Sequence, residues 1–259
     1  MSQEHPTSHG SGGRGDAPQL QETWKLAAAR AAVAAVPDGC VLGLGSGTTA
    51  ELMVHALAER VRSGLRVVGV PTSERTRRLA ASLGIPIAEF DDVATLDMSI
   101  DGADEVLLPT LDLIKGRGGA LLREKLIAAA SRDRVIIVDT SKLVCELGSQ
   151  SPVPIEVTPF GWRHTAARVA ALGTQPRLRL ADTPPATSTG SPAPANTPFV
   201  TDGGNYVLDC AFGPITAPAP LAAQIKAVTG VVDHGLFVGM TERVYAAGPD
   251  GVRVYTRPR

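Results

Sequence analysis

The hydrophobic pattern of residues 20–138 alternates between short apolar runs and longer segments with helical periodicity. Short apolar runs bounded by turn residues are typical of buried strands, whereas apolar positions three and four residues apart are typical of helices. The pattern predicts strands at 41–44, 66–70, 86–90, 97–100 and 134–138, and helices at 20–36, 48–62, 73–83 and 119–130. This alternation indicates βαβ units, and therefore an α/β fold built on a parallel sheet.

The rhythm changes from residue 155 onward, which indicates a second, smaller α+β unit. Strands are predicted at 155–158, 177–180 and 206–211, helices at 162–172 and 221–228, and short β segments at 235–259. Two stretches, 1–18 and 182–198, are polar, rich in Gly, Ser or Pro, and lack periodicity, which predicts a disordered tail and a flexible surface loop. We expect a larger domain at 19–150 plus 231–259 and a smaller domain at 151–230.

The charge balance bears on possible partners. The 259 residues include 25 Lys and Arg against 26 Asp and Glu, a formal net charge of −1, which argues against strong attraction to nucleic acid or anionic membranes. No apolar run approaches the ~18 residues that span a bilayer, and the first residues lack the apolar core of a signal peptide. We therefore expect a cytoplasmic protein with no nucleic-acid and no membrane partner.

The cysteines and histidines give no sign of a metal site or a disulfide framework. Cys40, Cys145 and Cys210 are widely spaced without a C-x-x-C pair, and the five histidines show no ligand spacing. Each cysteine lies in or beside an apolar run, so buried free thiols and no bound metal are expected.

A glycine-rich loop, GLGSGTT at residues 43–49, joins the first predicted strand to a helix. Glycines allow a tight turn, and the N–H groups at a helix start favour an anion, with hydroxyls from Ser46, Thr48 and Thr49 as further donors. Neither the P-loop consensus nor the dinucleotide fingerprint G-x-G-x-x-G is present. From the residues alone, a phosphate site and an ordinary glycine-rich turn are equally good interpretations.

An acidic segment, DGADE at residues 101–105, follows the strand predicted at 97–100. Ligands of open α/β sheets bind beyond the carboxyl ends of strands. Three neighbouring acids repel one another when ionised, so one of them is expected to have a raised pKa suited to proton transfer. The alternatives are a solvated loop with a helix-capping Asp, and a divalent-metal site, which the lack of other clustered acids disfavours.

A third loop, KGRGG at residues 115–119, leads into a helix that carries Arg123, Glu124 and Lys125. Glycine backbone with Lys115 and Arg117 at a helix start suits an oxyanion or a phosphate. The charges at 123–125 are typical of a solvated face, but leucines and an isoleucine flank them, so a partly desolvated Glu124 that acts as a base is the alternative.

A fourth polar loop, DTSK at residues 139–142, follows the strand at 134–138 and ends on Lys142. Four polar loops after four strands of one sheet would converge on one crevice. This coincidence indicates a functional site more strongly than any single motif does.

Ordered sequence blocks from about residue 20 to residue 240 resemble the A-type ribose-5-phosphate isomerase family. The blocks are GLGSGTT, PTSERT, DGADEV, KGRGGALLREKL, DTSKLV, PIEVTPF, TDGGNYVLDC and GVVDHGLFVGM. The resemblance implies a Rossmann-like catalytic domain with a smaller α+β domain, assembled as a homodimer or homotetramer. It implies an intramolecular oxidoreductase that interconverts D-ribose 5-phosphate and D-ribulose 5-phosphate in the pentose phosphate pathway, with a sugar phosphate as its ligand and no cofactor or metal.

The resemblance also implies roles for individual residues. Glu124 matches the proton-transferring carboxylate, and the catalytic set is Glu124, Asp101, Asp104 and Lys115. The expected substrate-binding residues are Lys25, Ser46, Gly47, Thr48, Thr49, Asp101, Gly102, Ala103, Asp104, Lys115, Gly116, Arg117, Gly118 and Lys142.

The chain departs from the family pattern in three blocks. Its first loop reads SGTT where TGST is usual, Arg117 replaces a usual glycine, and TDGGN replaces the commoner TDNGN. The hydroxyls of the first loop are kept, whereas Arg117 either alters access to the pocket or points to solvent.

Two other classes of function compete with the isomerase interpretation. One is a non-catalytic sugar-phosphate sensor, which should lack the base that this chain keeps as Glu124 with its polar neighbours. No basic helix-turn-helix segment is attached either. The other is an enzyme of related fold that acts on amino sugars or CoA esters, and the DGADE and KGRGG blocks argue against it.

Overall fold

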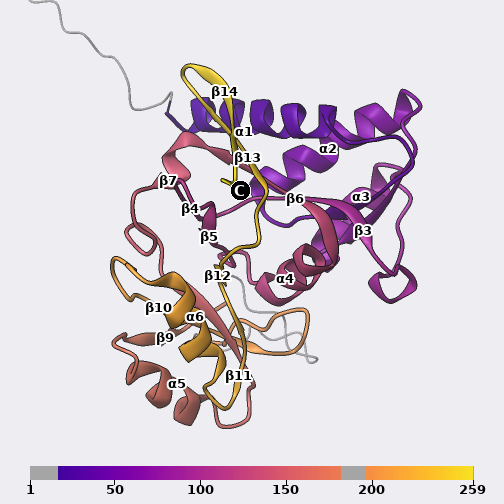
Figure 1. Ribbon diagram of the computed structural model, residues 1–259. Helices are drawn as coiled ribbons and strands as arrows, with labels where there is room; N and C mark the ends of the chain where they lie inside the picture. Colours follow the sequence, from indigo (N-terminus) through magenta and orange to yellow (C-terminus); the bar gives the residue numbers. More distant parts are fainter. Residues whose placement is uncertain (1–16, 182–195, 259) are drawn as a thin grey trace, which may run out of the picture.

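The computed structural model of the protein describes residues 17–181 and 196–258 (Figure 1). The tail predicted at 1–18 and the loop predicted at 182–198 therefore lie almost wholly outside the described residues. At the border of the tail, the first helix, α1 (Ala17–Ala34), begins three residues before the predicted start.

The largest sheet of the described chain has six strands, and all neighbouring strands are parallel except the final hairpin. In spatial order the strands are β14 (Gly251–Thr256), β13 (Arg243–Gly248), β6 (Ser131–Asp139), β3 (Leu96–Asp101), β1 (Cys40–Leu44) and β2 (Val67–Pro71). This sheet confirms the predicted α/β fold with a parallel sheet.

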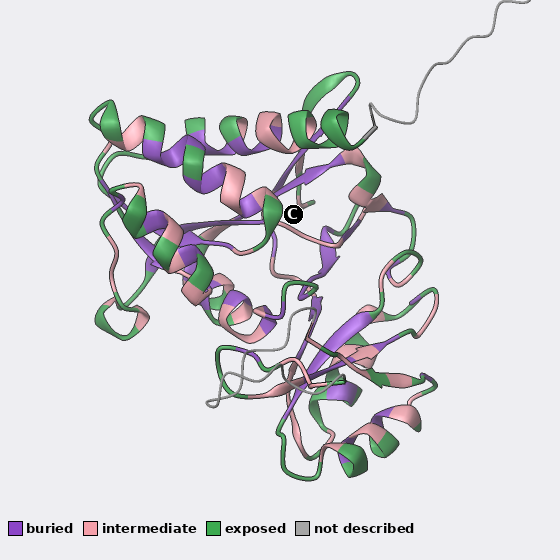
Figure 2. Ribbon diagram, turned by 180° about the vertical axis from the view of Figure 1, so that it is seen from behind, coloured by how far each residue is buried: buried purple, intermediate pink, exposed green. Residues whose placement is uncertain are grey.

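Helices cover both faces of this sheet. α1 and α2 (Thr48–Arg62) lie over one face with α3 (Glu74–Ser82) beside them, and α4 (Leu121–Ala130) lies on the opposite face (Figure 1). Successive strand residues point to opposite faces, so Ile137 of β6 joins the apolar core beneath α1, whereas Ile136 joins the core of the other face. Buried positions accordingly follow the sheet and the inner sides of the helices (Figure 2).

The order of the strands places a crevice at one edge of the sheet. β1 lies between β2 and β3, so the chain leaves β1 toward one side of the sheet and later returns on the other side. In such sheets the loops at the carboxyl ends of the two diverging strands separate and leave room for a ligand. Here these are the loops after β1 and β3, which carry the GLGSGTT and DGADE motifs.

A second, antiparallel sheet has its own apolar core. Its strands are β11 (Val231–His234), β8 (Val153–Val157), β10 (Tyr206–Cys210) and β9 (Pro176–Leu178), packed with α5 (Trp162–Ala170) and α6 (Pro218–Lys226). These elements match the predicted α+β pattern. The division into domains at 19–150 plus 231–259 and at 151–230 stays a prediction, which the separate core supports.

A third, small sheet lies between the other two (Figure 1), and the sequence pattern did not predict it. Its strands are β12 (Leu236–Phe237), β5 (Asp112–Ile114), β4 (Glu105–Leu107) and β7 (Leu143–Val144). Strands of two or three residues are too short to show periodicity. Because the KGRGG loop follows β5, the expectation that all four polar loops follow strands of one sheet is wrong for that loop.

Two further differences between the predictions and the structure concern one short strand and the burial of one cysteine. The strand predicted at 86–90 is reduced to a single bridge between Gly69 and Ile87, and η1 (Phe90–Asp92) follows it. The three cysteines are free and Cys40 and Cys210 are buried, but Cys145 is exposed, contrary to expectation. Cys145 follows the buried Val144 at the end of β7, and neighbouring residues of a strand face opposite sides.

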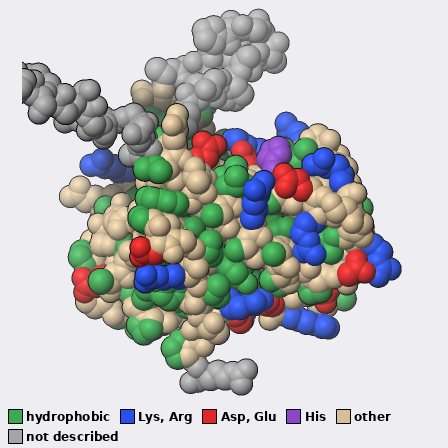
Figure 3. Space-filling model, turned by 90° about the horizontal axis from the view of Figure 1, so that it is seen from above, with side chains coloured by type: hydrophobic (Ala, Val, Ile, Leu, Met, Phe, Trp, Pro, Cys, Tyr) green, Lys and Arg blue, Asp and Glu red, His purple; other side chains and the backbone are tan. Residues whose placement is uncertain are grey.

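The distribution of charged side chains on the described surface is relevant to the prediction that nucleic acid is not a partner. On the face viewed in Figure 3, basic and acidic side chains are interspersed among apolar and small ones. This face therefore presents no continuous positive field of the kind that guides nucleic acid to a protein. No helix within the described ranges has both the length and the apolar character needed to cross a membrane.

Candidate active site

A cavity of about 590 Å³ lies at the carboxyl ends of β1 and β3. Its walls come from α1, the start of α2, the loops after β3 and β5, the short helix η2 (Thr140–Lys142) and residues 199–202. Nearly all the predicted site residues line it: Lys25, Ser46, Gly47, Thr48, Thr49, Gly102, Ala103, Asp104, Lys115, Gly116, Arg117, Gly118, Glu124 and Lys142. The four polar loops do converge on one crevice, as the sequence predicts.

The Lys115 ammonium is the centre of a buried charge cluster at the inner wall of the cavity. Its Nζ lies 3.0 Å from Asp101 Oδ2 and 3.2 Å from Glu124 Oε2, and it donates a 2.6 Å hydrogen bond to the Gly102 carbonyl. Lys115, Asp101 and Glu124 side chains are only 5%, 11% and 4% exposed. One buried cation therefore faces two buried carboxyls, an arrangement that favours a proton on one of them.

Glu124 extends from the first turn of α4, directly after the glycine-rich KGRGG loop. Burial raises the pKa of its carboxyl, Lys115 lowers it, and the charges of Asp101 and Asp104 raise it again, which brings it to about 8. Within the described chain, no donor makes a well-aligned hydrogen bond to Glu124 Oε2. A carboxyl with a pKa near neutrality and an available lone pair can accept a proton and return it.

Asp101 holds the loop after β1 rather than facing the cavity. Its Oδ1 accepts hydrogen bonds from the backbone N–H groups of Ser46 (3.1 Å) and Gly102 (2.7 Å), and its Oδ2 pairs with Lys115. Gly45 permits this approach, because a Cβ there would lie 2.2 Å from Asp101 Oδ1. Burial raises the pKa of the Asp101 carboxyl, against the opposing effects of Lys115 and the two amides. The prediction that Asp101 contacts substrate finds no support in this geometry.

The other two acids of the DGADE motif face different parts of the molecule. Asp104 lines the cavity, and its Oδ2 accepts a 3.0 Å hydrogen bond from the Arg117 backbone N–H. Glu105 is fully buried on the other side and accepts three backbone N–H groups, at 2.7, 2.7 and 2.5 Å, from Gly148, Gln150 and Ser151. Glu105 is therefore structural, and the mutual repulsion expected from the sequence involves the two aspartates and Glu124 instead.

The far end of the cavity is suited to an anion. α2 begins at Thr48, preceded by Gly47 with a φ of 89°. The first N–H groups of a helix have no intrahelical partner and carry the positive end of the helix dipole. Thr48 and Thr49 at this helix start line the cavity, and Lys25 and Lys142 line the same cavity. Phosphate groups commonly bind at such helix starts.

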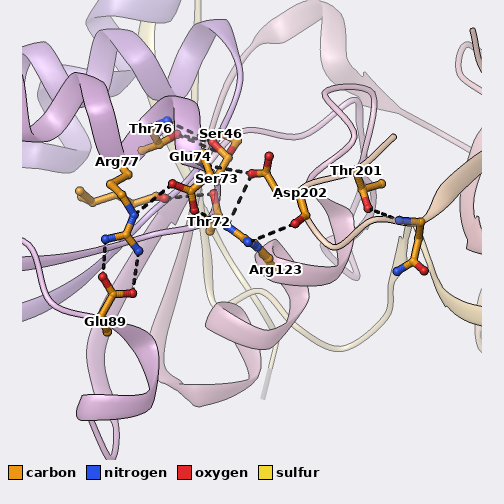
Figure 4. Close-up of polar contacts among 12 residues, drawn as sticks. Ser46, Thr72, Ser73, Glu74, Thr76, Arg77, Glu89, Arg123, Thr201 and Asp202 are labelled. Carbon is orange, nitrogen blue, oxygen red and sulfur yellow. Dashed lines mark hydrogen bonds and ion pairs between the residues drawn. The ribbon is translucent and has the colours of Figure 1, made fainter. Parts of the chain in front are cut away.

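The Ser46 hydroxyl has partners of its own. Its Oγ lies 2.6 Å from Thr72 Oγ1 and 3.4 Å from Thr76 Oγ1 (Figure 4). Those two hydroxyls in turn donate to the carbonyls of Leu44 (3.1 Å) and Gly45 (3.0 Å). This network fixes the end of β1 to the start of α3, so the Ser46 side chain shapes the loop as well as lining the cavity.

One wall of the cavity was not assigned from the sequence. Phe199, Val200 and Asp202 line it, although the TDGGN block had no role beyond the family match. Asp202 Oδ2 accepts a 2.9 Å hydrogen bond from the Glu74 backbone N–H, and Arg123 Nη1 lies 3.0 Å from Glu74 Oε1 and 3.5 Å from Asp202 Oδ2 (Figure 4). These contacts fix residues 199–202 to the starts of α3 and α4. Glu51, Ser73, Arg75, Gly119 and Ala120 are further unassigned lining residues.

Arg117, which replaces a usual glycine of the family, lines the cavity with an exposed side chain. Its backbone is held on two sides: the N–H donates to Asp104, and the carbonyl accepts a 3.0 Å hydrogen bond from Arg179. The Arg117 side chain is exposed to solvent, in contrast to the buried Lys115 cluster. Within the described residues, no group of three or more His, Cys, Asp or Glu side chains has a geometry that could hold a metal ion.

The fold and the cavity together define a class of protein. A buried carboxyl and a buried ammonium face a cavity that is also lined by a helix start with hydroxyls and by two further lysines. This combination is typical of α/β enzymes that transfer protons on small phosphorylated molecules.

Comparison with known proteins narrows this class. Residues 68–251 match the family model of ribose 5-phosphate isomerase A (phosphoriboisomerase A). The ribose-5-phosphate isomerase A of Gloeobacter violaceus is 53% identical over 232 residues, which cover 90% of this chain and 95% of that protein. The chain therefore belongs to the ribose 5-phosphate isomerase A family, as its sequence blocks indicated.

Solved structures agree with this assignment. The ribose 5-phosphate isomerase A of Methanocaldococcus jannaschii superposes with a TM-score of 0.83 at 36% identity, covering 92% of this chain and all of that one. A D-ribose-5-phosphate isomerase in complex with phospho-erythronic acid gives a TM-score of 0.84 at 34% identity, covering 91% of this chain and 99% of the other.

Proposed function

We propose that this protein interconverts D-ribose 5-phosphate and D-ribulose 5-phosphate through an enediolate, in the non-oxidative branch of the pentose phosphate pathway. The observation that carries the proposal is the buried contact between Lys115 and Glu124, 3.2 Å apart, in a cavity whose other end suits a phosphate.

The reaction moves one hydrogen between neighbouring carbon atoms. Glu124, in its carboxylate form, removes the proton from C2 of the open-chain aldose, and the electrons of the broken C–H bond form the C1–C2 double bond. Negative charge then develops on O1, where the Lys115 ammonium and the backbone N–H groups of residues 116–119 stabilise it. The protonated Glu124 exchanges its proton with solvent, and delivery of a proton from Glu124 to C1 leaves the carbonyl at C2 and completes the ketose.

The two oxygens also exchange a proton, because O1 gains one while O2 loses one. We assign this transfer, and the opening of the sugar ring, to Asp104, whose carboxyl lines the cavity. The family resemblance also placed Asp101 in the catalytic set. Its carboxylate is engaged with Lys115 and two backbone N–H groups, so we assign it the positioning of Lys115 instead.

Binding of the substrate phosphate at the start of α2 would fix the distance between the reacting carbon atoms and Glu124. Thr48 and Thr49, with Lys25 and Lys142, would hold the phosphate of the substrate and thereby place C1 and C2 beside Glu124. Fixing the reacting carbon atoms next to the base replaces a bimolecular encounter with a prepared geometry.

The related structure with phospho-erythronic acid supports the proposed enediolate intermediate. That ligand is a phosphorylated four-carbon sugar acid. Its planar carboxylate places two oxygens on one carbon and spreads negative charge over both, as an enediolate spreads charge over O1 and O2. A cavity that stabilises the enediolate is expected to bind such an acid.

We further propose that the protein acts in the cytoplasm as a homodimer or homotetramer, with a sugar phosphate as its ligand and neither nucleic acid nor membrane as a partner. An interface between copies would cover exposed apolar side chains, such as Phe160, which is 96% exposed, and Val252 and Val254 on β14. Light scattering coupled to size-exclusion chromatography measures the oligomeric state directly.

The activity is tested by an NMR time course with ribose 5-phosphate in D₂O, with and without EDTA. The expected result is ribulose 5-phosphate carrying solvent deuterium at C1, formed at the same rate in both samples. Glu124→Gln is the matched control and should form product at least about 100-fold more slowly. A wild-type protein that binds the sugar phosphate without converting it would instead be a sensor, and the proposed function would be wrong.

A further inference from the structure

Three consecutive charged residues of α4, at positions 123–125, reach three different parts of the molecule. The sequence pattern favoured a solvated face for them. In the structure, Arg123 contacts α3 and Asp202, Glu124 contacts Lys115, and the Lys125 side chain is only 15% exposed. Lys125 has no part in the proposed chemistry, so its burial calls for another explanation.

Lys125 is bound to the segment that runs from the end of β11 through β12, residues 233–237, which we call the anchor segment. Its Nζ donates a 2.6 Å hydrogen bond to Asp233 Oδ1 and a 2.5 Å hydrogen bond to the His234 carbonyl, and lies 4.9 Å from the centre of the Phe237 ring. A charged group buried with this many partners is costly to displace.

The anchor segment also binds Lys115. The Lys115 backbone N–H donates a 2.9 Å hydrogen bond to the Gly235 carbonyl, and Lys115 Nζ lies 5.6 Å from the centre of the Phe237 ring. Gly235 is required here, because a Cβ at this position would lie 2.2 Å from the Lys115 carbonyl oxygen. One segment of five residues thus contacts both the helix that carries Glu124 and the residue that faces Glu124.

We propose that Lys125 is a positioning residue for catalysis, which holds α4 against the anchor segment and thereby keeps Glu124 beside Lys115. The proposal rests on the proposed function, in which Glu124 is the base. Glu124 and Lys125 are neighbours on one rigid helix, so a displacement of Lys125 moves Glu124 with it. Near-attack geometry is sensitive to shifts of about 1 Å.

The surrounding charges determine what such a shift would do. The groups facing Glu124 are Lys115, Asp101 and Asp104, and those around Lys125 are Asp233, His234 and Lys226. Burial and the nearby Lys125 lower the pKa of His234 to about 4, so the ring is neutral near pH 7. Moving Glu124 away from Lys115 weakens the attraction that favours its carboxylate form.

The chain offers a matched control in Lys226. This residue of α6 pairs with the other oxygen of the same carboxylate, Asp233 Oδ2, at 3.0 Å, but does not lie on α4. Lys226→Met therefore removes an ion pair from the same partner without releasing the catalytic helix.

The experiment compares kcat, KM and the pH dependence of kcat/KM for wild type, Lys125→Met and Lys226→Met. For Lys125→Met we expect kcat to fall by roughly 10- to 100-fold, with KM little changed, and the acid limb of the pH profile to move to higher pH. Lys226→Met should keep the wild-type kcat and profile. The proposal is overturned if Lys125→Met retains wild-type kcat and profile, or if Lys226→Met reproduces both changes.

Asp233→Asn keeps the proposal testable if Lys125→Met does not fold. It weakens the contacts of both lysines, so a loss of kcat beyond that of Lys226→Met belongs to Lys125, and the absence of an additional loss contradicts the proposal. Titration of the Glu124 carboxyl by ¹³C NMR separates this proposal from the proposed function. A wild type without isomerase activity refutes the function, whereas an unchanged Glu124 titration in Lys125→Met refutes the positioning role.

Discussion

The Lys115 ammonium lies 3.2 Å from Glu124 Oε2, and the two side chains are 5% and 4% exposed. Asp101 pairs with the same ammonium from the other side, at 3.0 Å, so one cation serves two buried carboxyls. Asp101 also accepts two backbone N–H groups, which stabilise its ionised form. Within the described chain Glu124 accepts no backbone N–H group, and its pKa is raised to about 8, so we propose Glu124 as the carboxyl of this pair that takes up and releases the proton.

Glu124→Gln tests the role of the base most directly. Gln keeps the size of the side chain but cannot accept the C2 proton, so we expect kcat to fall by about 10²- to 10⁴-fold. Affinity for ribose 5-phosphate, measured by isothermal titration calorimetry, should stay close to that of wild type because the phosphate end is untouched. Turnover at the wild-type rate would exclude Glu124 as the base.

The pH dependence of the wild-type reaction should show the raised pKa of Glu124. The carboxylate form is the base, and its pKa is about 8, so kcat/KM should rise with pH and level off above that value. Steady-state assays in buffers of constant ionic strength provide the profile. The raised pKa would be contradicted by a profile that levels off just above the ordinary Glu pKa of 4.5 and stays flat up to neutral pH.

The same shift predicts how stability changes with pH. The folded protein keeps a proton on Glu124 up to about pH 8, whereas an unfolded Glu releases it near 4.5. The native state therefore binds more protons than the unfolded state within this window, so this group makes the free energy of unfolding fall as pH rises. Urea unfolding at several pH values should show Glu124→Gln gaining stability relative to wild type as pH rises. Parallel profiles of the two proteins would contradict the shift.

Removing the shared cation should destabilise the protein as well as inactivate it. Lys115→Met leaves the buried Asp101 carboxylate without its counter-ion, and breaking a buried ion pair in this way costs about 3–5 kcal/mol. Above about pH 8, where Glu124 is ionised, its carboxylate loses the same counter-ion. The loss should be smaller in acid, where the carboxyls are protonated. Above about pH 8, the double variant with Glu124→Gln lacks one unpaired carboxylate, so its loss should be less than the sum of the single losses. Strict additivity in urea unfolding would refute the coupling.

How far the sequence predicts this site differs from residue to residue. The start of α2 at Thr48 and the glycines before it have a local signature, and both were found where the sequence placed them. Burial of Glu124 was visible only as flanking leucines, and its role came from the family resemblance. The contact of Lys125 with Asp233 spans 108 positions of the chain, and no local pattern encodes it. Two- and three-residue strands such as β12 are likewise formed by tertiary pairing rather than by periodicity.

Glu105→Gln tests whether Glu105 has a structural rather than a catalytic role in the DGADE motif. Its carboxylate accepts three backbone N–H groups and does not line the cavity. Glu105→Gln removes an acceptor charge and turns an NH₂ group toward these donors, so we expect a loss of about 1–3 kcal/mol in the free energy of unfolding. Once folded, the variant should keep its kcat. Glu146→Gln, at an exposed position of the loop beside these donors, should change stability by less than about 0.5 kcal/mol. A large loss of kcat without a loss of stability would place Glu105 in the chemistry instead.

Lys25 tests the phosphate end of the cavity separately from the chemistry. Lys25 lies on α1 and lines the cavity. Lys25→Ala removes one cation from the proposed phosphate site, so KM should rise about tenfold, or ~1.4 kcal/mol, while kcat changes little, because the lost interaction is equal in substrate and transition state. Added salt should raise the KM of wild type more than that of the variant, since salt screens the lost charge. Arg30→Ala is the control on the same helix: Arg30 pairs with Glu59 at 3.6 Å, outside the cavity lining, and its loss should leave KM unchanged. If Lys25→Ala lowers kcat and leaves KM unchanged, the phosphate of the substrate lies elsewhere in the cavity.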